Sequence, residues 1–177
     1  HGEGNESADV MLIGEAPGYY ESVERRPFVG RSGQLLRKVL AESGLKASQV
    51  YISNIIKVRP PDNRDPLPHE ILAFKPYLDA EINLIKPKLI VTLGRFSMAK
   101  FLPEVKVSQV HGRLHKIKWN KRTLFILPMY HPAAALRATK IKESFVSDFA
   151  KIEKIITFVQ TAKDNEVFKE TVKEALL

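Results

Sequence analysis

The stretch VMLIGEAPG (residues 10–18) decides the fold predicted for this chain. Its four leading apolar residues are typical of a strand buried on both faces of a parallel sheet, and the Gly and Pro residues that follow predict a loop. Open α/β sheets usually bind their ligands where the strands end, at the carboxyl edge. The loop that carries Glu15 is therefore the first candidate for a functional site.

The same alternation of apolar runs and helical patterns continues along the chain. Further strands are predicted at residues 50–56, 88–93, 114–119 and 123–127, the last two as a hairpin. Apolar residues at helical spacing predict helices over residues 32–43, 68–86, 95–101, 133–137 and 144–160. Ser32 is expected to cap the first of these helices with its hydroxyl. We therefore predict an α/β fold, a three-layer α/β/α sandwich around a mainly parallel four-stranded sheet.

Length and composition limit the domain organisation and the partners. The 177 residues suit one domain over residues 1–160, followed by a charged helical tail over residues 161–177 that packs on it or extends from it. The net charge of +8 favours a polyanionic partner. The sequence has no cysteine, which excludes disulfides and cysteine-ligated metals formed by these residues.

The apolar segments are too short for a membrane span, which needs roughly 20 apolar residues. The first residues also lack the basic and then apolar pattern of a secretory signal. We therefore expect a monomeric, cytoplasmic protein that is neither secreted nor bound to a membrane.

Six motifs in a fixed order carry a family resemblance. They are Gly14-Glu15-Ala16-Pro17-Gly18 with Glu21, Pro27-Phe28-Val29-Gly30, Gly33-Gln34-Leu35-Leu36, Asn54, Lys57-x-Arg59-Pro60-Pro61-x-Asn63-Arg64, and His131-Pro132-Ala133. Together they resemble the thermostable, family 4 branch of the uracil-DNA glycosylases, from about residue 8 to residue 158. The resemblance implies an enzyme of base excision repair that flips uracil out of DNA and hydrolyses its N-glycosidic bond, leaving an abasic site.

The resemblance assigns three residues to uracil binding. Phe28 corresponds to the aromatic residue that stacks on the pyrimidine, although a core phenylalanine is the alternative. Asn54 corresponds to the reader of the base, because one carboxamide donates to O4 and accepts from N3–H. Ala16 lies in the same loop, where other branches of the superfamily have an aspartate.

Four residues are expected to carry the catalysis. His131 corresponds to the donor aimed at O2 of the departing uracil, and the sequence does not decide between its neutral and protonated forms. Because Ala16 has no carboxylate, the group that orients the attacking water stays open between Glu15 and, less favoured, Glu21. Asn63 also matches a family position and supports the pocket or the water.

The remaining candidates are expected to contact DNA. Backbone N–H groups of Gly30, Ser32 and Gly33 can face a phosphate at a helix start, although the loop is equally explained as a tight turn. Leu136 is the expected wedge into the duplex, with a buried helix position as its alternative. The further expected DNA contacts are Arg31, Gln34, Arg59, Arg64 and Arg137.

The sequence departs from the resembling branch at its cofactor. That branch holds a [4Fe–4S] cluster on four cysteines, and two of these positions align with Val58 and Phe74 here. We therefore expect no metal and no cofactor, and we expect Val58 and Phe74 to pack together as apolar core.

Three alternatives to a uracil glycosylase stay open. A catalytically silent DNA-damage-binding module would keep the fold without the reaction. A glycosylase with shifted specificity, for hypoxanthine or mismatched thymine, is compatible with Ala16. A nucleotide-binding domain that uses residues 14–18 as a phosphate loop fits less well, because the run lacks the Gly-Lys-Ser/Thr ending.

Overall fold

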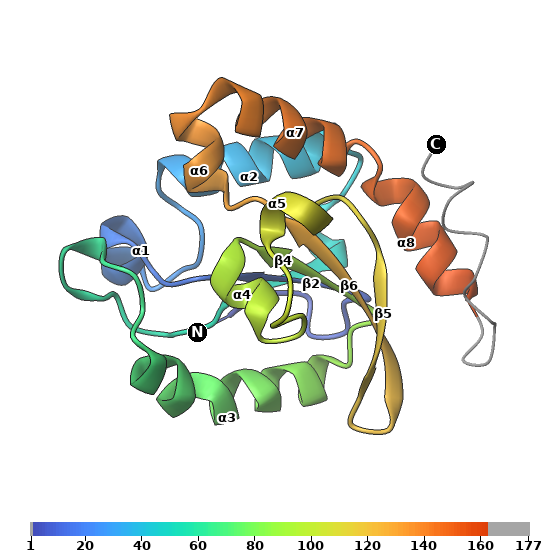
Figure 1. Ribbon diagram of the computed structural model, residues 1–177, viewed down its shortest axis with the longest axis horizontal. Coiled ribbons are helices and arrows are strands. Elements are labelled where there is room, and N and C mark those ends of the chain that lie inside the picture. Colours follow the sequence, from blue (N-terminus) through green and yellow to red (C-terminus); the bar gives the residue numbers. More distant parts are fainter. Residues whose placement is uncertain (1, 163–177) are drawn as a thin grey trace.

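The computed structural model describes residues 2–162, and these form one mixed α/β unit (Figure 1). Its sheet consists of β1 (Glu3–Gly4), β2 (Val10–Gly14), β3 (Val50–Asn54), β4 (Leu89–Leu93), β5 (His115–Trp119) and β6 (Arg122–Met129). The α/β class is confirmed. The predicted tail lies, from residue 163 onward, outside the described residues.

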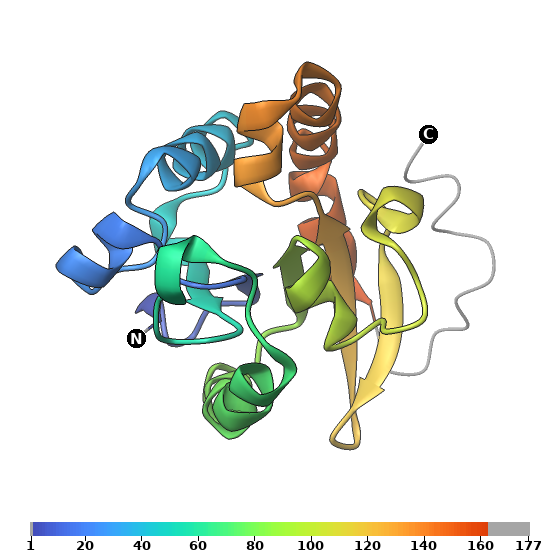
Figure 2. The same cartoon turned by 60° about the vertical axis from the view of Figure 1, so that its left-hand side comes forward.

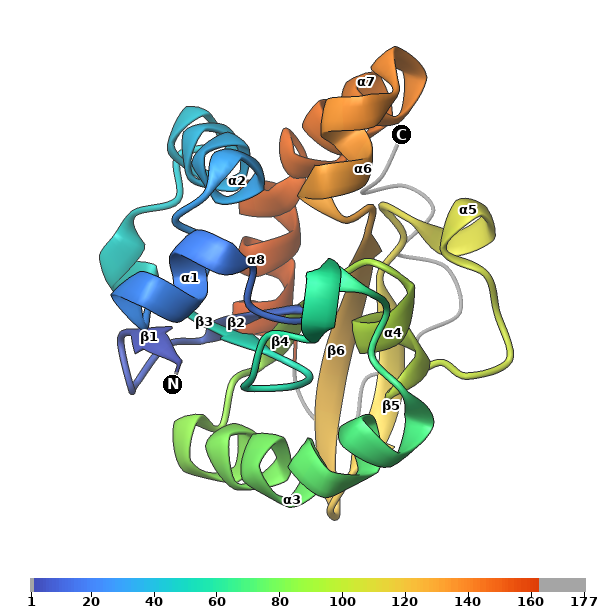
Figure 3. The same cartoon turned by 90° about the vertical axis from the view of Figure 1, so that its left-hand side faces the viewer.

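The strands lie in the order β1-β3-β2-β4-β6-β5, which can be followed across the sheet in Figure 3. The four central strands are parallel, whereas β1 and β5 pair antiparallel at the two edges. The expectation of a four-stranded sheet was therefore two strands short. The strand expected at residues 114–119 is β5, the first arm of the predicted hairpin, whereas β1 was missed because its two residues form no apolar run.

Helices cover both faces of the sheet (Figures 1 and 2). They are α1 (Tyr19–Glu24), α2 (Arg31–Glu42), α3 (Pro68–Ile85), α4 (Arg95–Ala99), α5 (Val107–Val110), α6 (Pro132–Arg137), α7 (Thr139–Phe149) and α8 (Ile152–Thr161), with 3₁₀ turns η1 (Ala47–Gln49) and η2 (Pro61–Asn63). Alternate residues of a strand point to opposite faces, so Val10 and Leu12 pack in one apolar cluster with α2, α7 and α8. Met11 and Ile13 pack in the other cluster with α3.

Two helix predictions need correction. The helix expected to start at Ser32 starts at Arg31, and its N-cap is Gly30 without a side-chain cap. The carboxylate of Glu21, from the preceding helix, accepts from the N–H of Gly30 at this helix start. The single helix expected over residues 144–160 is two helices, because the chain turns at residues 150–151 while the apolar faces of α7 and α8 both stay on the same cluster.

No helix within residues 2–162 combines the length and the apolar character that a membrane crossing requires.

Candidate active site

A pocket of about 610 Å³ opens at the carboxyl edge of the four parallel strands. The strand register creates it, because Gly14 at the end of β2 pairs with Asn54 at the end of β3. On the other side, Gly94 after β4 donates its N–H to the carbonyl of Met129 at the end of β6 (2.9 Å). Loops from all four strands therefore meet at one place, which is where such sheets bind ligands.

Asn54 lines this pocket and carries a buried polar atom without a hydrogen-bond partner. The side chain is only 7% exposed, and its Oδ1 has no hydrogen-bond partner. A buried amide oxygen without a partner costs free energy, which a ligand that donates to it recovers. Gly14 leaves the space for this arrangement, since a Cβ there would lie 2.4 Å from both Asn54 Oδ1 and Phe28 Cζ.

Phe28 is buried and holds a left-handed backbone conformation, with φ of 53°. This conformation is uncommon for a bulky residue and needs support from its surroundings. The buried Gly33 leaves room for it, because a Cβ at that position would meet the backbone of Phe28 at 2.1–2.5 Å. The Phe28 ring lies 6.0 Å, centroid to centroid, from the ring of His131.

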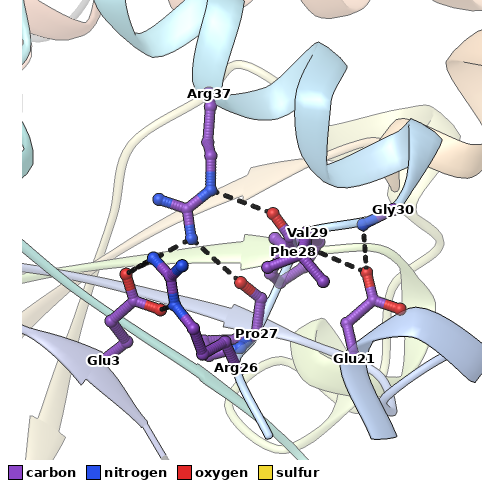
Figure 4. Close-up of polar contacts among 8 residues, drawn as sticks. All are labelled: Glu3, Glu21, Arg26, Pro27, Phe28, Val29, Gly30 and Arg37. Atoms are coloured by element: carbon purple, nitrogen blue, oxygen red, sulfur yellow. Dashed lines mark hydrogen bonds and ion pairs between the residues drawn. The ribbon is translucent and has the colours of Figure 1, made fainter. Parts of the chain in front are cut away.

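Two side chains brace the Phe28 loop from opposite sides (Figure 4). Oε1 of Glu21 accepts from the N–H groups of Val29 (3.0 Å) and Gly30 (2.8 Å), and Oε2 accepts from Gly18 (3.1 Å). On the other side, Arg37 donates from Nε to the carbonyl of Phe28 (2.9 Å) and from Nη2 to that of Pro27 (3.0 Å). The Phe28 loop is thus held by a carboxylate from α1 and a guanidinium from α2.

His131 is the N-cap of α6, and its Nδ1 accepts the N–H of Ala133 (3.1 Å). A nitrogen that accepts from a backbone amide carries no proton, so the neutral ring bears its proton on Nε2. Burial, with a smaller contribution from the charge of Arg137, lowers the pKa of His131 to about 4. Both observations favour a neutral His131 ring with its proton on Nε2 at physiological pH.

Glu15 lines the same pocket beside an exposed ion pair of Arg95 with Asp65. Burial raises the pKa of Glu15, the negative charge of Asp65 raises it further, and Arg95 lowers it. A carboxylate with a raised pKa is a better proton acceptor than an ordinary one, which suits a group that orients water.

A buried polar cluster supports the end of β3 from behind the pocket. Nζ of Lys57 donates to the carbonyl of Asn54 (3.1 Å), to Ser53 Oγ (2.6 Å) and to Glu81 Oε2 (2.6 Å). Ser53 Oγ also donates to Glu81 Oε2 (2.6 Å). Burial lowers the pKa of Lys57, while the hydrogen bond and charge of Glu81 oppose that shift. The cluster ties α3 to the backbone of the residue that carries the free carboxamide.

The structure brings most of the expected site residues to this single pocket. The residues that line it are Glu15, Ala16, Glu21, Phe28, Ser32, Asn54, Asn63, Arg64, His131 and Arg137. Six expected residues do not line it, namely Gly30, Arg31, Gly33, Gln34, Arg59 and Leu136. Leu136 is 42% exposed on α6, which disagrees with its alternative as a buried helix residue.

Several expected DNA contacts are already engaged within the chain. The N–H of Gly30 donates to Glu21, so it is not free for a phosphate, and Gly33 is buried against the backbone of Phe28. Arg64 makes a two-pronged pair with Glu70 (2.7 and 2.8 Å), which holds the pKa of that carboxyl at about 2. Arg59 donates from Nε to Asn63 Oδ1 (2.7 Å).

The two aligned cysteine positions offer no ligand for a cluster. Val58 is 61% exposed, so the expectation that it packs as apolar core was wrong; it follows β3 in a surface loop. Phe74 is half-buried and packs against the cluster of Met11 and Ile13. Both side chains are hydrocarbons at the wall of a second pocket, and no group of three His, Asp or Glu residues suited to a metal occurs within residues 2–162. The residues present therefore do not fit a cysteine-ligated cluster.

Arg37 and Glu81 were missed by reasoning from the sequence. Neither belongs to a recognised motif, and each acts through a contact with a distant segment. The sequence does show that both residues belong to amphipathic helices. That position alone does not indicate which distant segment a polar side chain will contact.

Comparisons with known proteins agree with this geometry. The family model described as the uracil DNA glycosylase superfamily matches residues 1–153. A type-4 uracil-DNA glycosylase of Sulfurisphaera tokodaii is 42% identical over 160 residues, covering 87% of this chain and 73% of the relative. Two further type-4 uracil-DNA glycosylases are also similar. That of Archaeoglobus fulgidus is 42% identical and covers 85% of this chain and 78% of the relative. That of Thermotoga maritima is 38% identical and covers 88% of this chain and 81% of the relative. The chain belongs to the uracil DNA glycosylase superfamily.

Proposed function

We propose that the chain is a monofunctional uracil-DNA glycosylase, which flips uracil out of DNA and hydrolyses its N-glycosidic bond. One observation carries the proposal. The same pocket is lined by the ring of Phe28, by Asn54 with its unsatisfied carboxamide oxygen, and by the neutral imidazole of His131. This set matches a planar base with one apolar face, an N3–H donor and carbonyl acceptors.

In the proposed reaction, water adds to C1′ of the deoxyribose while the bond from C1′ to N1 of uracil breaks. The uracil leaves as an anion, and Nε2–H of His131 stabilises the charge that develops at O2. The added water loses one proton to solvent and the uracil anion takes one up, so neutral uracil and an abasic site with a hydroxyl on C1′ remain. We assign the orientation of the water to Glu15, with Asn63 as a supporting residue, and Ala16 as a contact of the bound base.

Phosphate contacts are assigned to exposed groups around the pocket. Support comes from the net charge of +8 and from the position of Arg137 and Ser32 in the wall of the pocket. The assigned residues are Arg31, Ser32, Gln34, Arg59, Arg64 and Arg137, with Leu136 as the wedge that occupies the space left by the flipped base; Gly30 and Gly33 are withdrawn because their backbones are engaged within the chain.

The test is base release from labelled duplexes that carry uracil, hypoxanthine or thymine opposite guanine, followed by alkaline cleavage. We expect strand breaks on the uracil duplex and little on the other two. Binding without breaks on any duplex would support the silent module instead, and breaks mainly at hypoxanthine or thymine would support the shifted specificity.

Substitution of Glu21 tests whether this residue supports the Phe28 loop or activates the attacking water. Replacing it with alanine leaves the N–H groups of Gly18, Val29 and Gly30 without their acceptor, so Phe28 loses its brace. Hydrogen bonds to a charged group are worth about 1.5–3 kcal/mol each, so we expect a loss of at least about tenfold in kcat/KM. Glu21→Gln keeps an acceptor oxygen for Val29 and Gly30 and is expected to retain most activity.

The measurement is the single-turnover rate of both variants, with Tm as a check on folding. If Glu21 activates water instead, the glutamine variant will lose as much rate as the alanine variant, because neither can accept a proton at neutral pH.

We further propose that the enzyme works without an iron–sulfur cluster, as a monomer and in the cytoplasm. The absence of any cysteine from the 177 residues supports the first of these. Visible absorbance typical of an iron–sulfur cluster in anaerobically purified protein would contradict it, and sedimentation analysis tests the oligomeric state.

A further inference from the structure

Two adjacent tyrosines on α1 expose their rings to solvent. Tyr19 is 58% and Tyr20 61% exposed, and the rings contact each other edge to face at 5.4 Å between centroids. None of the residues of α1 is buried, so these rings contribute nothing to either apolar cluster. Large aromatic side chains that are exposed side by side are typical of a surface that binds a ligand or another macromolecule.

The pair stands at the rim of the pocket. α1 begins directly after Gly18, and both Gly18 and Glu21 line the pocket on either side of the tyrosines in sequence. A Cβ placed on Gly30 would lie 3.7 Å from Cδ2 of Tyr20, so this ring lies against the loop that positions Phe28. In Figure 1, α1 lies beside the loop that runs from β3 to α3.

That second loop supplies a cation to the same surface. The guanidinium carbon of Arg59 lies 5.5 Å from the ring centroid of Tyr19, and Nε of Arg59 donates to Asn63, a residue of the pocket wall. Arg31, exposed at the start of α2, follows the glycine that Tyr20 contacts. Aromatic rings with arginines beside them are the combination with which proteins bind single-stranded nucleic acid, by stacking bases and pairing with phosphates.

We propose that Tyr19 and Tyr20 form a platform on which the nucleobase next to the flipped uracil stacks, in a single-stranded region of the substrate strand. The inference rests on the proposed glycosylase function and names the strand form that the site prefers. When the uracil is flipped out, the adjacent nucleobase loses the uracil as a stacking partner. The tyrosine platform takes the place of the uracil where the strand leaves the pocket. In a duplex the neighbour keeps its pairing and its other stacking contact, so the platform contributes less there.

The experiment compares a Tyr19→Ala/Tyr20→Ala double variant with the wild type on three uracil substrates of the same sequence. These are a single strand, a duplex, and a single strand whose nucleotides flanking the uracil lack bases. We expect the double variant to raise KM about tenfold on the ordinary single strand, less on the duplex, and not measurably on the strand without flanking bases. The corresponding phenylalanine double variant keeps the rings and is expected to behave as the wild type.

Tyr77→Ala is the matched control, because Tyr77 is 65% exposed on α3 and does not line the pocket. An unchanged KM of the alanine double variant on the single strand overturns the proposal, and so does an equal loss on the strand without flanking bases. A loss in the phenylalanine variant as large as in the alanine variant also overturns it, since the rings are then not the cause.

A binding measurement separates failure of the platform from failure of the proposed function. With 2-aminopurine beside the uracil, stacking on the platform changes its fluorescence when wild-type protein binds, and the alanine double variant is expected to abolish most of that change. If no uracil is released but the fluorescence difference persists, the function fails and the platform stands. If uracil is released and the two proteins give the same fluorescence, the platform fails alone.

Discussion

His131→Ala is expected to lower kcat for uracil release by about 10²–10³-fold, with a much smaller change in KM, as removal of one donor from a developing anion usually does. His131 lines the pocket, and Nε2 carries the proton of the neutral ring because Nδ1 accepts the N–H of Ala133. Charge at O2 of uracil forms as the glycosidic bond breaks, so this hydrogen bond strengthens in the transition state more than in the bound substrate. The measurement is the single-turnover rate at saturating enzyme, with Tm as a check on folding.

The pKa of His131 also predicts how the rate of uracil release depends on pH. Burial holds its pKa at about 4, well below the ordinary value near 6.5, so the ring is neutral throughout the range in which a free histidine titrates. The wild-type rate is therefore expected to show no fall attributable to His131 as pH rises from about 5 to 8. A rate that falls with rising pH through about 6.5, and that loses this fall in His131→Ala, would show that the reaction uses the protonated ring.

An exposed histidine gives the matched control. His69 lies in the first turn of α3, outside the pocket, and His69→Ala is expected to keep the wild-type rate and pH profile. If His131→Ala also keeps the wild-type rate, the assignment of the O2 donor is wrong even where the activity is right.

The part of the fold that positions the pocket could be predicted because it depends on local signals. Residues 10–13 are all apolar, residues 89–93 are apolar except for Thr92, and a glycine follows each run, so both the strands and their carboxyl edge can be recognised from sequence. Glu15 follows the first of these runs and Asn54 lies toward the end of the strand expected at residues 50–56, and both line one pocket. The turn between α7 and α8 has no such signal, because the apolar spacing continues through it.

The supports of the site could not be predicted, because they depend on contacts between distant segments. Glu21 has the spacing of a pocket acid, yet its carboxylate turns to three backbone N–H groups. Arg37 has the appearance of a solvated helix residue, yet it donates to the carbonyls of the Phe28 loop. Sequence indicates which side chains can react, whereas the hydrogen bonds that orient them depend on how the fold places α1 and α2 around the Phe28 loop.

Asn54→Asp is expected to lower uracil release by about 10²-fold or more, because a site built around a paired amide leaves buried groups unpaired when that pairing fails. Uracil presents N3–H as a donor and O4 as an acceptor, and a carboxamide meets both. A carboxylate still accepts from N3–H but offers O4 no donor and places a negative charge against it. The 7% exposure of this side chain leaves little room for water to relieve the mismatch.

The same substitution is expected to create weak activity on cytosine at acidic pH. Cytosine presents an amino donor at N4 and an acceptor at N3, which a protonated carboxyl group matches with its carbonyl oxygen and its hydroxyl. The measurement is release of labelled uracil and labelled cytosine from matched oligonucleotides across pH, with Asn83→Asp as the control because Asn83 is exposed on α3. Loss of uracil activity without any cytosine release at low pH would mean that the carboxamide supports the pocket without reading the base. Equal activity of Asn54→Asp and wild type on uracil would remove Asn54 from the site altogether, since no other buried amide lines this pocket within residues 2–162.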